Sequence, residues 1–230
     1  MNILALESSA KAASAALCRD GLLLAESYQN SGLTHSRTLL PLCQELLERC
    51  ELPLEQVDLI AVAHGPGSFT GLRIGLATAK GLAWPDEKPC LGVSTLEAMA
   101  WNFLGWDGVI CCAMDARRAQ VYNALFRMGP QGPERLCEDR AISLTELTRD
   151  PNLPGALLVG DGAELCLRSA PELGLRLAPP NLRFQHAYGV ARCALEHIRA
   201  GEHGDAASLA AHYLRLSQAE RERLEREKRG

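Results

Sequence analysis

The sequence predicts an α/β protein of two lobes, and three observations lead to that prediction. The chain begins with three β-type segments at residues 2–7, 13–18 and 22–28, and an Arg19-Asp20-Gly21 turn typical of a β-hairpin joins the last two. A further β-type run leads through a glycine-rich turn into a helical pattern. After residue 105 a shorter strand–turn–strand order begins again, as expected of a second lobe.

The other elements follow from hydrophobic spacing and capping residues. Leucines at helical spacing predict a helix with a broad apolar face at residues 36–49. Ser94, with Glu97 three positions on, predicts the N-cap of the helix at residues 95–103. The remaining strands are expected at 57–63, 89–93, 109–114, 120–127 and 156–159, and the remaining helices at 68–84, 163–169 and 186–200. The expected divisions are a lobe of residues 1–105, a lobe of residues 106–216 and a charged tail of residues 217–230.

Composition narrows the class of protein. Of the 230 residues, 47% are hydrophobic, and the formal charge of −4 gives no general attraction to a polyanion. No apolar run approaches the roughly 20 residues that cross a bilayer, and Glu7 comes too early for a secretory signal. Nine cysteines without a C-x-x-C pair predict reduced thiols, mostly in the core. We therefore expect a cytoplasmic protein.

The densest signal is the run GPGSFTGLRIG at residues 65–75. A glycine turn between a strand and a helix can bind an anion, but the run matches neither the P-loop nor the dinucleotide-binding pattern. Gly71, Gly75 and Ala79 lie four apart and share one helix face. This face could pack against the protein's own sheet, or, together with helix 36–49, against another subunit. In the second case Gly75→Leu would disrupt pairing and leave the monomer folded.

Several motifs together resemble the TsaB family. They are ILALESS at 3–9, HS at 35–36 with LLP at 39–41, the run at 65–75 followed by AKG at 79–81, GVSTL at 92–96, DARR at 115–118 with VY at 121–122, and YLR at 213–215 with AE at 219–220. The resemblance extends from residue 2 to about residue 220. It implies an actin-like (ASKHA, ribonuclease H-like) fold of two lobes, with the second lobe reduced.

The resemblance also implies a function. Proteins of this family are non-catalytic scaffold or dimerisation subunits that bind TsaD as a heterodimer and can form a homodimer through the same surface. With the ATPase TsaE, the complex carries out threonylcarbamoylation (t6A) of the adenosine next to the anticodon in tRNAs reading codons beginning with A. The complex uses ATP and Mg²⁺, and we expect this chain to bind no cofactor itself; direct tRNA contact stays open. The implied interface residues are His35, Leu39, Leu42, Leu46, Phe69, Gly71, Leu72, Gly75 and Leu76.

The resemblance to the TsaB family argues against nucleotide binding by this chain. The family usually has aspartate where this chain has Glu7. In addition, the phosphate-binding loop of actin-like kinases has a glycine after its aspartate, whereas Asp115 is followed by Ala116. We therefore expect at most a vestigial nucleotide site formed by Glu7, Ser8, Ser9 and Asp115. TsaD-like catalysis depends on a His-x-x-x-His metal pair, which this sequence lacks, so we expect no metal site and no catalytic residue. The alternative function is an autonomous actin-like ATPase or small-molecule kinase.

Three further features have alternative interpretations, and a fourth, Ser68, argues against one class of enzyme. Arg117-Arg118 could close a salt-bridged hairpin or bind a partner carboxylate or tRNA phosphate. Gly160-Asp161-Gly162 could be an adenosine-binding turn or an ordinary one. Ser68 lies outside any G-x-S-x-G motif, which disfavours a protease. The charged tail could be a solvated helix or a docking segment.

Overall fold

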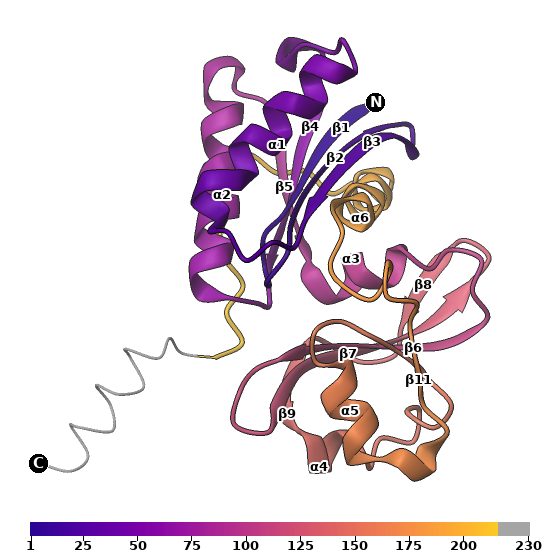
Figure 1. Ribbon diagram of the computed structural model, residues 1–230. Helices are drawn as coiled ribbons and strands as arrows, with labels where there is room; N and C mark the ends of the chain where they lie inside the picture. The colour runs from indigo at the N-terminus through magenta and orange to yellow at the C-terminus, as the bar shows by residue number, and fades with distance from the viewer. Residues whose placement is uncertain (216–230) are drawn as a thin grey trace, which may run out of the picture.

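The computed structural model describes residues 1–215, which form two α/β lobes stacked one above the other (Figure 1). The first lobe has a five-stranded sheet in the order β3-β2-β1-β4-β5. β2 pairs antiparallel with both β1 and β3, whereas β4 and β5 continue the sheet in parallel. The strands are β1 (Asn2–Glu7), β2 (Ala13–Arg19), β3 (Leu22–Gln29), β4 (Leu59–Gly65) and β5 (Cys90–Ser94).

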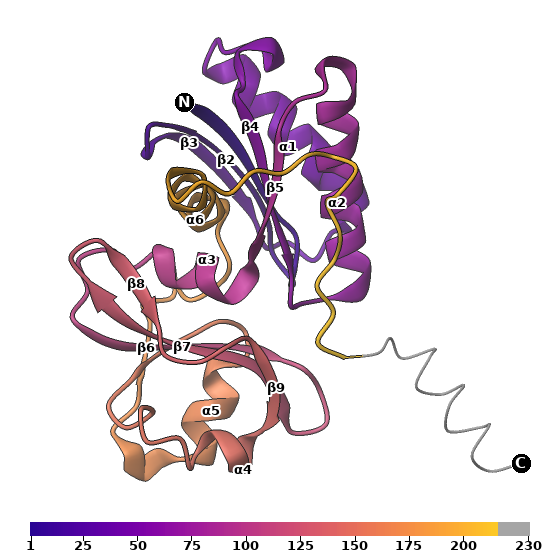
Figure 2. The same ribbon diagram turned by 180° about the vertical axis from the view of Figure 1, so that it is seen from behind.

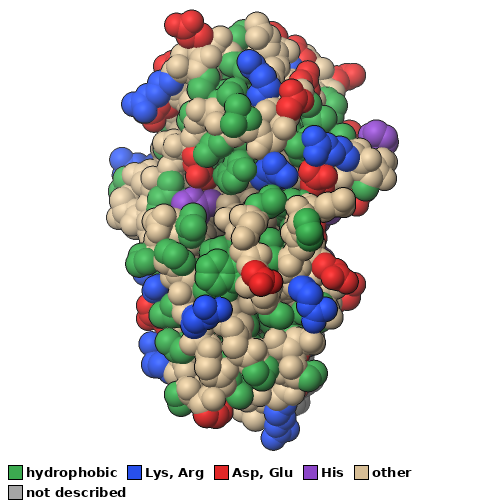
Figure 3. All heavy atoms as spheres, turned by 90° about the vertical axis from the view of Figure 1, so that its right-hand side faces the viewer, with side chains coloured by type: hydrophobic (Ala, Val, Ile, Leu, Met, Phe, Trp, Pro, Cys, Tyr) green, Lys and Arg blue, Asp and Glu red, His purple; other side chains and the backbone are tan. Residues whose placement is uncertain are grey.

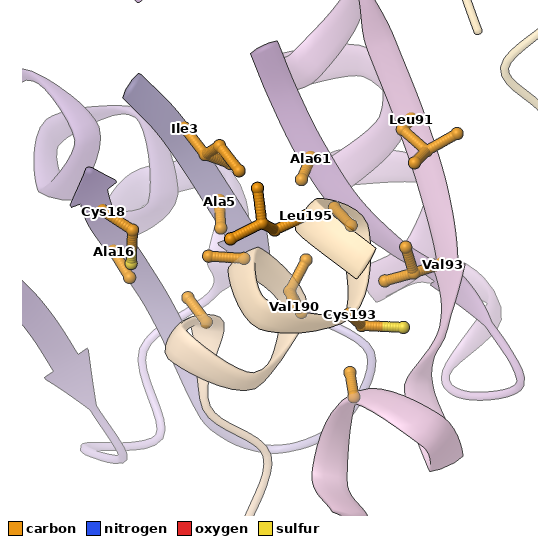
Figure 4. Packing of buried hydrophobic residues seen from close by; sticks show 14 of the residues in the cluster. Ile3, Ala5, Ala16, Cys18, Ala61, Leu91, Val93, Val190, Cys193 and Leu195 are labelled. Atoms are coloured by element: carbon orange, nitrogen blue, oxygen red, sulfur yellow. The ribbon is translucent and has the colours of Figure 1, made fainter. Parts of the chain in front are cut away.

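Helices cover both faces of this sheet, because neighbouring residues on a strand point to opposite faces. Leu4 and Leu6 of β1 pack in the cluster that contains helices α1 (His35–Arg49) and α2 (Phe69–Ala83). Ile3 and Ala5 pack on the other face with helix α6 (Ala187–Arg199), as Figure 4 shows. The expected Ser94 N-cap is confirmed, since its hydroxyl accepts the N–H of Glu97, and the Ser68 hydroxyl caps α2 by accepting the N–H of Gly71.

The second lobe is a six-stranded sheet in the order β11-β10-β6-β7-β8, with β9 paired to β7. Helix α3 (Thr95–Trp101) lies between the two sheets, and its Leu96 and Met99 pack in the core of the second lobe. The elements of this lobe are β6 (Gly108–Asp115), β7 (Gln120–Gly129), β8 (Gly132–Arg135), β9 (Arg140–Ser143), α4 (Leu144–Leu147), β10 (Leu157–Val159), α5 (Ala163–Ser169) and β11 (Arg176–Leu177). Short 3-10 turns complete the chain at Leu54–Gln56, Trp84–Asp86 and Pro171–Leu173.

The expected lobe boundaries need one correction. The change of sheet falls between β5 and β6, but residues 187–215 do not stay with the second lobe. Helix α6 packs on the first sheet, and the segment after it runs back past β5 and α2 (Figure 2). Its backbone pairs with β5 through Cys90 N to Gly204 O at 3.1 Å and with β4 through His212 N to His64 O at 2.8 Å. The second lobe is therefore an insertion into the first.

Two expectations about composition can be checked on the described residues. All nine cysteines are free thiols, and seven of them are buried. No helix within residues 1–215 is long and apolar enough to cross a membrane. The charged tail expected at 217–230 lies outside the described residues.

Candidate functional site in the interlobe cleft

A cleft of about 920 Å³ lies where the two lobes meet. Strand ends and turns of both sheets line it, as is usual for ligand sites in α/β proteins. The C-terminal segment also lines it, at residues 212–215. The other lining residues that the sequence had singled out are Ser9, Gly67, Ser68, Phe69, Asp115, Ala116, Arg117, Tyr122, Gly160 and Asp161.

The acid at the end of β1 does not open onto this cleft. Glu7 is 1% exposed, and its Oε1 accepts the N–H of Ser9 at 2.5 Å. Burial raises the pKa of the Glu7 carboxyl to about 7, with smaller lowering contributions from the hydrogen bonds to Ser9. Of the four residues expected in a vestigial nucleotide site, only Ser9 and Asp115 line the cleft. A carboxyl so enclosed is poorly placed to hold a metal–phosphate group.

The glycine-rich turn is held against the residues that follow β1 by the backbone N–H of Ser68. Ser68 N donates to Ser9 O at 2.6 Å, and a Cβ on Gly67 would lie 2.5 Å from that same oxygen. Gly67 is therefore needed for the close approach of β1 and the turn. Ser68 Oγ is occupied as the N-cap of α2, accepting Gly71 N at 3.3 Å. The Ser68 amide is therefore already used within the fold.

The stripe of small residues on α2 packs within the protein itself, which is the first of the two alternatives that the sequence left open. A Cβ on Gly71 would lie 2.1 Å from Ser8 O, and a Cβ on Gly75 would lie 2.5 Å from Ser8 Oγ. Gly75→Leu therefore has no room in the monomer itself. The expected interface residues that are buried in this way are Leu39, Leu46, Gly71, Leu72, Gly75 and Leu76.

The other three expected interface residues are partly buried by intramolecular contacts. His35 Nε2 lies 2.7 Å from Ala10 O. Leu42 packs at the edge of the α1–α2 cluster. The Phe69 ring stacks on Tyr213 with the ring centres 4.5 Å apart, and the Arg73 guanidinium lies over its other side at 3.9 Å. The C-terminal segment thus covers the beginning of α2.

On the second lobe, Asp115 begins a tight turn. Its Oδ1 accepts Arg117 N at 2.7 Å, and its Oδ2 lies 3.5 Å from Arg117 Nη1, so the salt-bridged hairpin end is found for Arg117. Arg117, Arg118 and Ala119 all have positive φ, between 55° and 65°. Left-handed backbone is unfavourable for residues with a Cβ, so three in a row make this a strained turn at the rim of the cleft.

Sequence reasoning missed two arginines that contribute to this cleft. Arg215 Nη1 donates to Ala116 O and so joins the C-terminal segment to the Asp115 turn. Arg183 is paired with Glu164 at 3.1 Å. Only the YLR motif at 213–215 gave a signal for Arg215, and no pattern indicated Arg183. Asp161 faces the same space, and burial raises its pKa although Gln185 donates a hydrogen bond to it.

Comparisons with known proteins agree with this architecture. A family model described as TsaD: tRNA N6-adenosine threonylcarbamoyltransferase matches residues 29–167. The tRNA threonylcarbamoyladenosine biosynthesis protein TsaB of Bacillus subtilis is 32% identical over 99% of this chain and 100% of its own length. The protein of the same name from Escherichia coli is 36% identical over 65% of each chain.

Solved structures extend the comparison to the fold. YeaZ from Pseudomonas aeruginosa superposes with a TM-score of 0.82 at 26% identity, over 93% of this chain and 99% of that chain. Component A of the (R)-2-hydroxyglutaryl-CoA dehydratase of Acidaminococcus fermentans gives a TM-score of 0.52 at 10% identity, over 88% and 100%, which is a likeness of fold alone.

The two lobes, the order of the first sheet and the cleft between them define an actin-like protein of the ASKHA type. The second sheet repeats the order of the first, with two antiparallel strands on one side of a central strand and two parallel strands on the other. Within that class the chain belongs to the TsaB family, which the TsaD family model also covers.

Proposed function

We propose that this chain is a non-catalytic scaffold subunit in tRNA threonylcarbamoyladenosine biosynthesis, which pairs with the threonylcarbamoyltransferase TsaD and supports it. The observation that carries the proposal is the relationship to Bacillus subtilis TsaB over the whole of both chains. Pairing within this group is favoured further because one family model describes both kinds of subunit.

The outer face of α1 and α2 supports a pairing role. Both helices lie on the same side of the first sheet (Figure 1), and their outward side chains include apolar ones with no cover. Leu40 is 42% exposed and Trp84, just after α2, is 81% exposed. Gly81 has nothing within 4 Å of the place where a Cβ would stand. Small and apolar residues on adjacent helices let a second helical pair approach closely.

The interior of the cleft supports a non-catalytic role. The Glu7 carboxyl is enclosed, and the Ser68 amide is used within the fold. We propose that TsaD and TsaE supply the ATP and Mg²⁺ chemistry and that this chain binds neither.

The surface charge supports tRNA being held mainly by the other subunits. Figure 3 shows charges of both signs interspersed on one face, and the net charge is −4. A polyanion needs a concentrated basic surface.

The test is light-scattering size-exclusion chromatography of this chain, of TsaD from the same organism, and of an equimolar mixture. We expect a heterodimer peak in the mixture. Leu40→Glu should abolish that peak, because it places a charge in the apolar face. Leu104→Glu is the matched control, since Leu104 is also 42% exposed but lies outside α1 and α2.

An unchanged mixture of two separate peaks contradicts the proposal. A homodimer of the chain alone that dissociates when TsaD is added would indicate that both pairings use one surface. ATP hydrolysis by the isolated chain, lost in Glu7→Ala, would favour the alternative of an autonomous ATPase or kinase.

A further inference from the structure

A cluster of three potential metal ligands lies away from the interlobe cleft, where α3 meets α6. Glu97 comes from the first turn of α3, and Cys193 and His197 come from α6. Glu97 Oε1 lies 3.0 Å from His197 Nε2 and 3.4 Å from Cys193 Sγ, and Sγ lies 3.6 Å from Nε2. The three ligand atoms therefore form a nearly equilateral triangle.

Local structure places these atoms together. Cys193 and His197 are four residues apart, so they project from the same face of α6. Figure 4 shows Cys193 on the side of α6 that packs against Val93 of β5, and Ala98 of α3 belongs to the same cluster. Glu97 is fixed because its backbone N–H is held by the Ser94 N-cap.

Two further charged residues, Arg135 and Glu202, orient the ligands by contacting the atoms of Glu97 and His197 that face away from the cluster. Arg135 Nη2 binds Glu97 Oε2 at 2.8 Å, which leaves Oε1 facing the cysteine and the histidine. Glu202 Oε2 lies 3.1 Å from His197 Nδ1, so a proton held there leaves the Nε2 lone pair facing the other ligands. A carboxylate behind a histidine in this way is the usual outer support of a metal-bound imidazole.

The size of the triangle suits a tetrahedral ion. Zinc bonds of about 2.3 Å to sulfur and about 2.0–2.1 Å to nitrogen and oxygen place neighbouring ligand atoms about 3.3–3.6 Å apart. The observed edges of 3.0, 3.4 and 3.6 Å need little change to reach those values. His197 is 25% and Glu97 19% exposed at their side chains, which leaves an entry path for an ion.

We propose that Glu97, Cys193 and His197 form a binding site for a divalent transition metal, with Zn²⁺ as the best-fitting ion and one coordination position open to water. Binding replaces the His197–Glu97 hydrogen bond by two metal–ligand bonds and adds a third from sulfur, while the thiol and imidazole protons leave to solvent. The thiolate and the Glu97 carboxylate together neutralise the ion. Arg135, which pairs with Glu97, is itself balanced by Asp139 at 2.5 Å.

The site would be structural, joining the lobes rather than catalysing a reaction. Glu97 belongs to the helix between the lobes, His197 and Cys193 to the helix that completes the first lobe, and Arg135 to β8 of the second lobe. A simpler interpretation is an ion pair of His197 with Glu97 beside a buried core cysteine. The two interpretations differ in whether the thiol takes part, and this decides the experiment.

The experiment titrates Zn²⁺, and separately Co²⁺, into the full-length reduced protein freed of metal. We expect one ion per chain, a rise in melting temperature with Zn²⁺, and a thiolate-to-cobalt charge-transfer absorption with Co²⁺. Cys193→Ser and His197→Gln should each weaken binding by more than about 100-fold. Glu202→Gln removes only the outer support and should weaken it by about tenfold. Matched controls are Cys43→Ser, another buried cysteine, and His203→Gln, an exposed histidine; both should bind as the parent does.

Two results with the parent protein and Cys193→Ser overturn the proposal. One is a parent protein that binds no metal, and the other is a parent whose affinity Cys193→Ser leaves unchanged. Because Cys193 is buried, circular dichroism of each metal-free variant checks that it is folded. Glu202 is exposed, so Glu202→Gln gives a result that does not depend on the packing of the core. Unchanged metal binding in both Glu202→Gln and His197→Gln also contradicts the site.

Discussion

The inner and outer faces of α2 carry small residues at the same spacing in opposite surroundings. Gly71, Gly75 and Ala79 are buried, and the two glycines touch Ser8 at the end of β1. Ala77 and Gly81 are also four apart but are exposed. Glycine within a helix costs about 1 kcal/mol relative to alanine, and on the inner face the close contact with β1 offsets this cost. Spacing alone therefore does not tell which stripe is free for a partner.

Gly75→Leu is the strongest test of the difference between the two faces of α2. The leucine side chain would start 2.5 Å from Ser8 Oγ and 3.4 Å from Val62 Cγ2, so the strand end must move. We expect a loss of about 3 kcal/mol or more in the free energy of unfolding, measured by urea denaturation. Ala77→Leu, on the outer face of the same helix, is the matched control and should change stability by less than about 0.5 kcal/mol. Equal stabilities of the two variants would mean that the inner stripe is not packed as described.

The second prediction concerns pH, because Glu7, which precedes the Ser8 that the inner stripe contacts, is a buried acid. The pKa of Glu7 is about 7 in the folded protein and 4.5 in the unfolded chain. Between these values the unfolded chain loses a proton that the folded protein keeps, so stability falls as pH rises, by about 3 kcal/mol in total. Below pH 4.5 and above pH 7 this contribution is constant.

Glu7→Gln removes the titrating group while keeping an oxygen for the Ser9 N–H. Urea denaturation from pH 5 to pH 8 should show the parent losing stability relative to this variant. A constant difference across that range would mean that Glu7 is ionised in the folded protein at all these values.

The smallest expected effect belongs to Gly81→Ala on the outer face. Nothing lies within 4 Å of the added methyl group and the helix gains propensity, so we expect stabilisation of up to about 1 kcal/mol. Thermal unfolding of the isolated chain measures this gain. A destabilised variant would show that Gly81, like Gly75, is needed for packing within the chain.

Much of the fold could be predicted from sequence periodicity. The strand at Asn2–Glu7 and the helix at Ala163–Ser169 are confirmed at both ends, and the other expected helices and strands are confirmed with boundaries shifted by a few residues. The strands β8, β9 and β11 were missed because they are only two to four residues long and, unlike the equally short β10, contain no continuous apolar run. Strands so short have no measurable alternation and form through pairing with neighbours distant in the chain.

The proposed metal site at Glu97, Cys193 and His197 was less predictable, because it depends on which residues far apart in the chain come together. That α6 returns to the first lobe brings Cys193 and His197 to Glu97, some hundred residues earlier in the chain. The Cys-x-x-x-His spacing on a predicted helix was available as a signal, but a search for paired histidines alone overlooked it. The inward direction of the Gly71–Gly75 face likewise depends on the position of Ser8, which no local pattern gives.

The insertion of the second lobe into the first also sets an order of events during synthesis. When the five strands of the first sheet have left the ribosome, the face that carries Ile3 and Ala5 still lacks α6. About 90 further residues must be made first, which takes roughly 5–20 s at about 5–20 residues per second. During that interval the apolar face that carries Ile3 and Ala5 lacks the helix that covers it in the folded protein, and such exposed surface favours aggregation.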